Sequence, residues 1–409
     1  MLTGRGIAVL TAGVSLWIAA RIIGSQDVHI VAVGLVVLGA LAASAVRFLR
    51  QTLEAGRRLS VSRAFPGTRI RVELEVRNAG RSRTGVLLLE DRLPAGLGRA
   101  ARAVLGGIPP RGKQTVSYSA RCRSRGRYRI GPLTAYVTDP FGLARTTISF
   151  SAQDDLIVYP EVEELEPPRS ASAGGGPGTS RARHLLRSGE DFYTMRQYEV
   201  GDDLRRIHWP SVAKTGELMI RQHEAARRAA ATVFLDTRAR ILPSGDPFER
   251  AVSVAASISA AYTRAGYALR FSSPDLLPVP MSVDEVLETL ALVEHSDARL
   301  LSPALMRLRD AGGAYAALVI VTHVPEPAEL PTLIRAAAGY GPKLAVLVEP
   351  RDSSKLDPEA WEQAELRKSG ARLSLVRAGW NVLLIGPTGR LRDVWHLREK
   401  RPARTAAES

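Results

Sequence analysis

The chain has 409 residues, of which 45% are hydrophobic and 24% are charged, and this composition excludes a wholly disordered protein. Its length allows two or three domains with full-sized cores. Its single cysteine, Cys122, excludes both a disulfide framework and a zinc site built from several thiolates.

The formal net charge of +15 does not by itself indicate nucleic-acid binding. Only six of the 56 basic residues are lysines, and a bias toward arginine accompanies a GC-rich genome whatever the function. No recognition motif accompanies the charge, which also suits contact with anionic lipid headgroups. We therefore expect no nucleic-acid partner.

Two apolar stretches open the chain, Gly6 to Gly24 and Val28 to Val46. Each approaches the ~20 residues that span a bilayer core, so the pattern predicts a two-helix transmembrane hairpin over residues 1–50. Arginines flank both outer ends, namely Arg5 before the first stretch and Arg47, Arg50, Arg57, Arg58 and Arg63 after the second. By the positive-inside rule the protein is a multi-pass protein of the plasma membrane with its soluble part in the cytoplasm. The alternatives are a cleaved signal peptide over Leu2 to Ala20 and a buried globular hairpin.

Residues 51–160 show the pattern of a β-sandwich. Apolar residues alternate with charged ones from Ile70 to Val76, and similar short runs follow between Gly and Pro turns. The alternation in one of these runs, from Val116 to Cys122, places Cys122 in the core as a small hydrophobic residue. A stretch rich in Gly and Pro, residues 161–186, is predicted to be a flexible linker.

The densest motif of the chain lies in residues 187–228. Six of its residues are candidates for binding a protein partner, because arginines and aromatic side chains anchor many interfaces: Arg196, Tyr198, Asp202, Arg205, Trp209 and Arg221. The alternative is that these side chains only hold the segment against the next domain.

The spacing of this motif, G-x-x-F-x-x-x-R-x-Y-x-x-G-D-x-x-R-x-I-x-W from Gly189 to Trp209, resembles the signature of the domain of unknown function 58 family. The β-segment agrees through Arg125 to Leu133 and through Asp139-Pro140-Phe141-Gly142-Leu143. The resemblance implies a membrane-anchored protein with an immunoglobulin-like sandwich and a C-terminal α/β domain like that of von Willebrand factor A. It implies a MoxR-type AAA+ ATPase as partner, with a transglutaminase-like membrane protein as a further one. It implies no biochemical activity.

Strands and helices alternate in residues 229–398, which predicts a mostly parallel sheet covered on both faces. Predicted strands lie at Thr232–Leu235, Ala268–Ser272, Leu318–Thr322, Leu344–Glu349 and Arg372–Val376. Helix starts are predicted near Asp246, at the capping box that begins at Ser282, and at Asp357-Pro358. Residues 399–409 are predicted to be a disordered tail.

Asp236 follows the first of these strands, at the place where a von Willebrand A domain begins its metal site, D-x-S-x-S. Here the run is Asp236-Thr237-Arg238-Ala239-Arg240, so both serine positions hold arginine. Guanidinium groups oppose a cation, and we expect a degenerate site at Asp236 and Thr237 that holds no metal. Asp236 would then form an ion pair with Arg238 or Arg240.

The sequence contains no recognisable catalytic pattern. No metal-binding histidine pair and no nucleophile elbow occur, and Glu163 and Glu164 stand in the predicted linker. The sequence therefore favours a non-enzymatic scaffold or adaptor without a cofactor. The competing hypotheses are a metal-dependent binding module and an enzyme subunit of a cell-envelope pathway.

Overall fold

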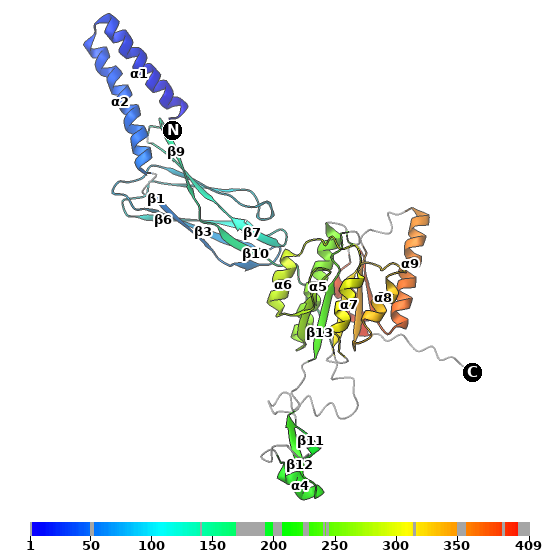
Figure 1. Cartoon of the computed structure of the whole chain (residues 1–409). Coiled ribbons are helices and arrows are strands. Elements are labelled where there is room, and N and C mark those ends of the chain that lie inside the picture. The colour runs from blue at the N-terminus through cyan, green and yellow to red at the C-terminus, as the bar shows by residue number, and fades with distance from the viewer. Residues whose placement is uncertain are drawn as a thin grey trace. The chain divides into compact units, whose positions relative to one another are not determined.

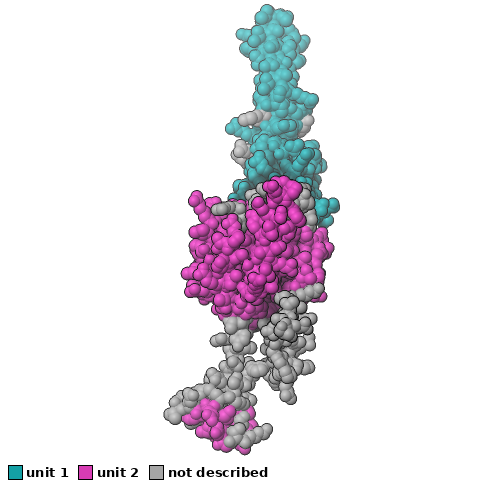
Figure 2. Space-filling model, turned by 90° about the vertical axis from the view of Figure 1, so that its right-hand side faces the viewer, with its two compact units in different colours: residues 1–161 teal, residues 162–409 magenta. Residues whose placement is uncertain are grey.

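The computed structural model describes residues 2–49, 53–139, 141–168, 193–198, 207–223, 229–239, 242, 245–313, 316–349, 357–386 and 389–399. The chain forms two compact units, residues 1–161 and residues 162–409, which Figure 2 colours teal and magenta. Each unit has its own core.

The first unit begins with two antiparallel helices, α1 (Gly4–Ile23) and α2 (Gln26–Leu49) (Figure 1). The hydroxyl of Thr3 caps α1, and Gly24 ends it with a φ of 73° that suits a residue without Cβ. Both helices are long and apolar enough to cross a membrane, and only 17% of each apolar window is buried. A core helix of a soluble protein would be mostly buried, so the exposed apolar surface sets these helices apart from one.

The rest of the first unit is β-rich, as predicted, and consists of three small sheets. The first pairs β1 (Leu53–Leu59), β3 (Arg69–Asn78) and β6 (Lys113–Arg121). The second pairs β2 (Arg63–Ala64), β10 (Asp154–Val158) and β7 (Gly126–Ile130). The third pairs β5 (Ala101–Leu105), β4 (Leu87–Asp91), β8 (Leu133–Thr138) and β9 (Arg145–Phe150).

One shared core fills this β-rich part. The alternating residues of β3 point their apolar side chains into it, because successive side chains of a strand face opposite sides. Cys122 is buried in the same core, as the sequence predicts. Burial raises the pKa of its thiol, which disfavours the reactive thiolate.

The second unit contains a six-stranded sheet in the order β15-β14-β13-β16-β17-β18. Its strands are β13 (Ala230–Leu235), β14 (Ala268–Ser272), β15 (Val279–Pro280), β16 (Ala317–Thr322), β17 (Lys343–Val348) and β18 (Asn381–Ile385). All neighbouring strands are parallel except β15, which pairs antiparallel at one edge. Every residue of β16 is buried, as expected for a central strand with both faces covered.

The helices that accompany this sheet are α5 (Asp246–Arg264), α6 (Val283–Leu292), α7 (Ser302–Asp310), α8 (Leu330–Ala336), α9 (Pro358–Arg377) and α10 (Leu391–Trp395). A final 3-10 turn, η5, covers His396–Glu399. The predicted capping box is present at the start of α6, where Ser282 and Glu285 bond reciprocally. Helices α7, α8 and α9 share one core with Phe234 of β13.

The predicted last strand is wrong. Residues Arg372–Val376 belong to α9, and the strand that follows is β18. The helix capped by Asp357 continues for 20 residues because Ala371 and Leu375, one turn apart, are both buried on its inner face. The chain leaves the helix only near Gly379, whose φ is 80°.

The start of the predicted linker is also wrong. Residues 162–168 belong to the second unit, where the Glu163 carboxylate accepts hydrogen bonds from the amides of Leu391 and Arg392 at 3.2 and 3.0 Å. A carboxylate suits these unpaired amides at the first turn of α10. Leu165 is buried as well, so this segment is part of the domain. The remaining linker residues, 169–186, and most of the predicted tail, 400–409, lie outside the described residues.

Candidate functional site

The order of the sheet places a candidate site at the ends of β13 and β16. Numbered by their sequence order within this sheet, the six strands are arranged 3-2-1-4-5-6. The connections in such a sheet turn in opposite directions on either side of the first and fourth strands. Sheets of this kind bind ligands in the crevice beyond the carboxyl ends of those two strands. Asp236 follows β13 directly, and Thr322 is the last residue of β16.

A buried ionic network closes this position. The Arg238 guanidinium donates to both carboxylate oxygens of Asp236, from Nε at 2.9 Å and from Nη2 at 2.8 Å. Its Nη1 donates to Glu329 at 2.6 Å, and the Thr322 hydroxyl donates to Asp236 at 2.8 Å. The side chains of Asp236 and Arg238 are 0% and 3% exposed. One of the two ion pairs that the sequence suggests for Asp236 is therefore formed, and Arg240 lies outside the described residues.

The charged form of the Arg238 guanidinium is stabilised by its partners. Burial alone would lower the pKa of its guanidinium, but the hydrogen bonds to Asp236 and Glu329 raise that pKa above its ordinary value. The bidentate arrangement also fixes the side chain geometrically. Arg238 thereby joins the end of β13 to Glu329, the residue that precedes α8.

These residues do not fit a divalent cation. Such an ion would need the oxygens of Asp236 and Thr322, but both carboxylate oxygens already accept from the guanidinium. A second positive charge beside Arg238 would be repelled in this buried position. Within the described part of the chain, no group of three His, Cys, Asp or Glu side chains is placed to hold a metal.

A pocket of about 210 Å³ opens beside the network. It lies between the start of α7 and the segment that leads into α8, and Arg238 and Glu329 form part of its wall. Its side chains include the exposed Leu300 and Arg299. On the other side, His323 directly follows Thr322, and its Nδ1 lies 3.3 Å from the carbonyl of Val348. Burial lowers the pKa of His323.

Sequence reasoning missed two members of the network. Glu329 lies 91 residues after Arg238, and no local pattern links the two positions. Thr322 was predicted only as the last residue of a strand. The alternation of strands and helices predicted the edge of the sheet where Asp236 lies. The same signal could have placed Thr322, at the end of another strand, on that edge.

The motif segment forms a separate small element. Strands β11 (Tyr193–Gln197) and β12 (Met219–His223) pair antiparallel, and the short helix α4 (Trp209–Thr215) precedes β12. The backbone amides of Tyr198 and His208 donate to the carbonyls of Leu218 and Met219, both close to the start of β12.

The six candidate partner-binding residues are distributed over this element and beyond it. Arg196 lies on β11, paired with Ile220, and Arg221 lies on β12, paired with Met195. Tyr198 is half-buried, and Trp209 is 66% exposed at the start of α4. Asp202 and Arg205 lie outside the described residues, so the role of the six remains a prediction.

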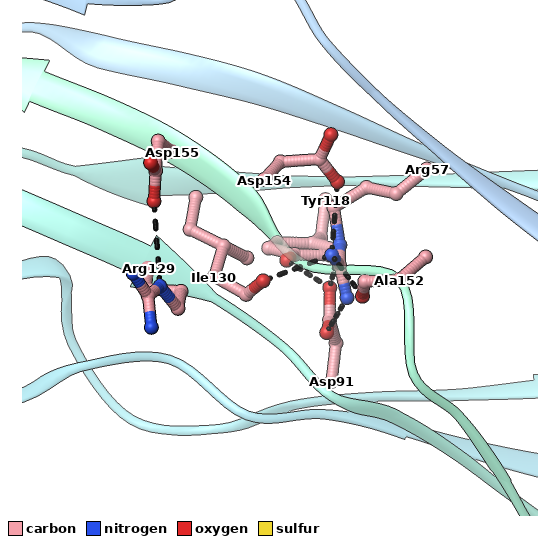
Figure 3. Close-up of polar contacts among 8 residues, drawn as sticks. All are labelled: Arg57, Asp91, Tyr118, Arg129, Ile130, Ala152, Asp154 and Asp155. Atoms are coloured by element: carbon pink, nitrogen blue, oxygen red, sulfur yellow. Dashed lines mark hydrogen bonds and ion pairs between the residues drawn. The ribbon is translucent and has the colours of Figure 1, made fainter.

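The first unit contains a second buried ionic cluster, which the sequence did not reveal (Figure 3). Arg57 on β1 donates to Asp91 at the end of β4 at 2.5 and 3.0 Å, and their side chains are 1% and 0% exposed. The Tyr118 hydroxyl donates to Asp91 at 2.6 Å, and Arg57 also reaches Asp154 at 3.0 Å. The cluster joins strands of three sheets and is structural.

Comparisons with known proteins place the motif segment and the first part of the second unit in one family. Residues 194–274 match the family described as "Protein of unknown function DUF58". The chain is also 26% identical over 221 residues to "Uncharacterized protein YeaD" of Bacillus subtilis (strain 168). Both matches support the assignment of this chain to the DUF58 family. The match with YeaD covers 51% of this chain and about half, 52%, of that relative.

Two solved structures each resemble about a quarter of this chain. The CARDB domain of a Pyrococcus furiosus protein is 14% identical, covers 26% of this chain and 94% of its own, and has a TM-score of 0.20. A cohesin module of Clostridium perfringens is 10% identical, covers 26% of this chain and 96% of its own, and has a TM-score of 0.21.

Proposed function

We propose that this DUF58 protein is a membrane-anchored, non-enzymatic scaffold that presents a cytoplasmic surface to a protein partner. In this proposal α1 and α2 span the plasma membrane as a hairpin. The support is their length, their exposed apolar surface and the arginines at their outer ends.

We further propose that the second unit is a von Willebrand factor A-like domain with a degenerate metal site. The strand order with one antiparallel edge strand supports this assignment, as does Asp236 at the end of the first strand.

The observation that carries the scaffold role is the guanidinium of Arg238 on both oxygens of Asp236. A carboxylate held in this way is not available as a general base or as a metal ligand. In this domain the crevice where such sheets bind ligands or catalyse reactions holds a stabilising ion pair instead. This favours a role in presenting a binding surface over a role in catalysis.

The partner in this proposal is a MoxR-type AAA+ ATPase, which is what the family resemblance implies. The contact surface would include Trp209, because an exposed tryptophan is a common anchor of protein interfaces. An envelope-bound transglutaminase-like protein would be a further member of the assembly.

The test is a pull-down of the intact protein from its native membranes in mild detergent, with ATP or with ADP, read by mass spectrometry. We expect an AAA+ ATPase to be recovered in one nucleotide state and lost in Trp209→Ala. The matched control is Trp361→Ala, which removes another exposed tryptophan, 47% exposed on α9. Recovery of no ATPase by the folded wild-type protein, or equal recovery by both variants, would contradict the partner or the surface respectively.

A further inference from the structure

The turn between β8 and β9 is bound to the start of the helical hairpin. The amide of Thr3 donates to the carbonyl of Leu143 at 2.8 Å, and the Thr3 hydroxyl donates to the carbonyl of Gly142 at 2.6 Å. Leu2 also pairs with Ala144 as an isolated β-bridge. A Cβ on Gly6 would lie 2.0 Å from the Leu143 oxygen, so only glycine permits this approach.

Asp139 fixes the shape of this turn. Its carboxylate accepts from the amide of Phe141 at 2.9 Å and from the amide of Ala144 at 2.5 Å. Both carboxylate oxygens of Asp139 therefore bind the turn's own amides, and the residue is 5% exposed. The family motif from Asp139 to Leu143 therefore builds a turn that fits against the hairpin.

The inner side of the turn reaches the apolar part of both helices. Leu143 and Ala144 form one cluster with Ala42 and Val46 of α2, and further apolar residues pack against it, Val9 of α1 and Leu38 of α2. A 20-residue helix such as α1 is about 30 Å long, the thickness of a bilayer core. Val9 lies about 8 Å from the start of α1 along its axis, so the turn contacts the outermost third of this helix.

The outer side of the turn carries an aromatic residue among arginines. Phe141 is 64% exposed, and Arg5, Arg47 and Arg145 are exposed at the same end of the hairpin. Within the described part of the chain, neither Arg5 nor Arg47 forms an ion pair. Aromatic rings favour the headgroup region of a bilayer, and guanidinium groups bind its phosphates.

We propose that the turn between β8 and β9 is a second membrane contact, in which Phe141 enters the headgroup region and the surrounding arginines bind anionic phospholipids. The occupant is the surface of the bilayer that the hairpin spans, because the turn is continuous with the apolar surface of the hairpin and its charge complements anionic headgroups. This inference rests on the membrane-spanning hairpin of the proposed function and needs no protein partner.

The test measures depth in the membrane with a nitroxide label on single cysteines of the full chain. Cys122 can be kept, because it is buried. The probe site is Phe141→Cys. One control, Val14→Cys, reports the middle of α1, where Val14 is 50% exposed. The other control, Val61→Cys, lies just after Leu59, the last residue of β1. Val61 is 43% exposed.

The protein is reconstituted in vesicles of phosphatidylcholine with phosphatidylglycerol, and in vesicles of phosphatidylcholine alone. The relaxation of the nitroxide label by oxygen is then compared with its relaxation by a water-soluble nickel chelate. We expect the label at 141 to be shielded from nickel relative to the label at 61, at a depth between positions 61 and 14. The shielding should weaken in the vesicles without phosphatidylglycerol.

Four outcomes would overturn the proposal in distinguishable ways. Equal nickel access at 141 and 61, with 14 protected, leaves the hairpin in the membrane and removes only the second contact. Shielding at 141 in native membranes but in neither vesicle would assign the turn to a protein instead. Nickel access at position 14 would remove the spanning hairpin as well. Equal shielding in both vesicles would refute the binding of anionic headgroups.

Discussion

Asp91 lies fully buried in the first unit and is neutralised by Arg57, with a further hydrogen bond from Tyr118. Replacement of Tyr118 by Phe leaves that carboxylate short of one donor, so we expect unfolding to become easier by about 1.5–3 kcal/mol, as for hydrogen bonds to charged groups. Urea unfolding of the solubilised chain measures this loss. Tyr136→Phe is the control, since Tyr136 is also half-buried in a strand of this unit; an equal loss there would refute the role of the cluster.

Tyr118 also gives the cluster a dependence on alkaline pH. Burial, together with the hydrogen bond to Asp91, raises the pKa of the Tyr118 hydroxyl. Its contribution to stability is therefore complete below about pH 10, the ordinary tyrosine pKa, and is lost progressively as the pH rises beyond that value. The wild-type protein should lose more stability than Tyr118→Phe in this alkaline range.

His323, beside the buried network of the second unit, predicts a dependence on acid pH. Because burial lowers its pKa in the folded state, the unfolded chain binds a proton first as the pH falls below about 6.5. The stability that neutral His323 contributes is present above that pH and is lost as the pH falls through the folded-state pKa. Thermal melts of the wild-type protein and of His323→Gln between pH 7 and 5 should diverge, and parallel curves would contradict the assignment.

At the scale of elements, Arg238 links the end of β13 to the residue before α8. Removal of one member of a buried ion pair leaves an uncompensated charge, so Arg238→Met should cost about 3–5 kcal/mol. Asp236→Asn combined with Arg238→Met should cost less than the sum of the two single changes, because the double variant holds no buried charge at this pair. Arg299→Met, which changes an exposed arginine of the same pocket, should have little effect. Strict additivity in the double variant would refute the coupling.

The same network predicts indifference to divalent cations. A ligand that binds only the folded state raises the free energy of unfolding with the logarithm of its concentration over Kd, and the melting temperature rises with it. We expect millimolar Mg²⁺ or Mn²⁺ to leave the melting temperature of the wild-type protein unchanged. A rise abolished by Asp236→Asn would show that a cation displaces Arg238.

The elements show which parts of the fold a sequence can predict. Strand β3 and the capping box at Ser282 are specified by neighbouring residues, and both predictions agree with the structure. The end of α9 is different, since Arg372–Val376 alternates as a strand does and only burial of Ala371 and Leu375 keeps it helical. The role of Glu163 as a cap could not be predicted either, because it depends on α10, more than two hundred residues later. The site was predictable at Asp236 and not at Glu329 for the same reason.

At the scale of the whole molecule, the arginine distribution predicts which side of the membrane the soluble units occupy. A membrane-impermeant maleimide added to intact spheroplasts should label Gln26→Cys, at the start of α2 beside the connection between the helices, and should label Val61→Cys only after permeabilisation. The wild-type protein is the unlabelled control, because its single cysteine, Cys122, is buried. Labelling of Val61→Cys from outside would reverse the orientation and exclude a cytoplasmic ATPase as partner.

The close approach of Gly6 to Leu143 has a mechanical consequence. A domain joined to its anchor by a single stretch of chain can swivel about that stretch. Here the covalent connection from α2 to β1 is one attachment, and the hydrogen bonds between Thr3 and the turn are a second. Two attachments remove the torsional freedom, so the azimuth of the sandwich about the hairpin axis is set. If two copies met through their helices, each would present the same predetermined side of its sandwich to the other.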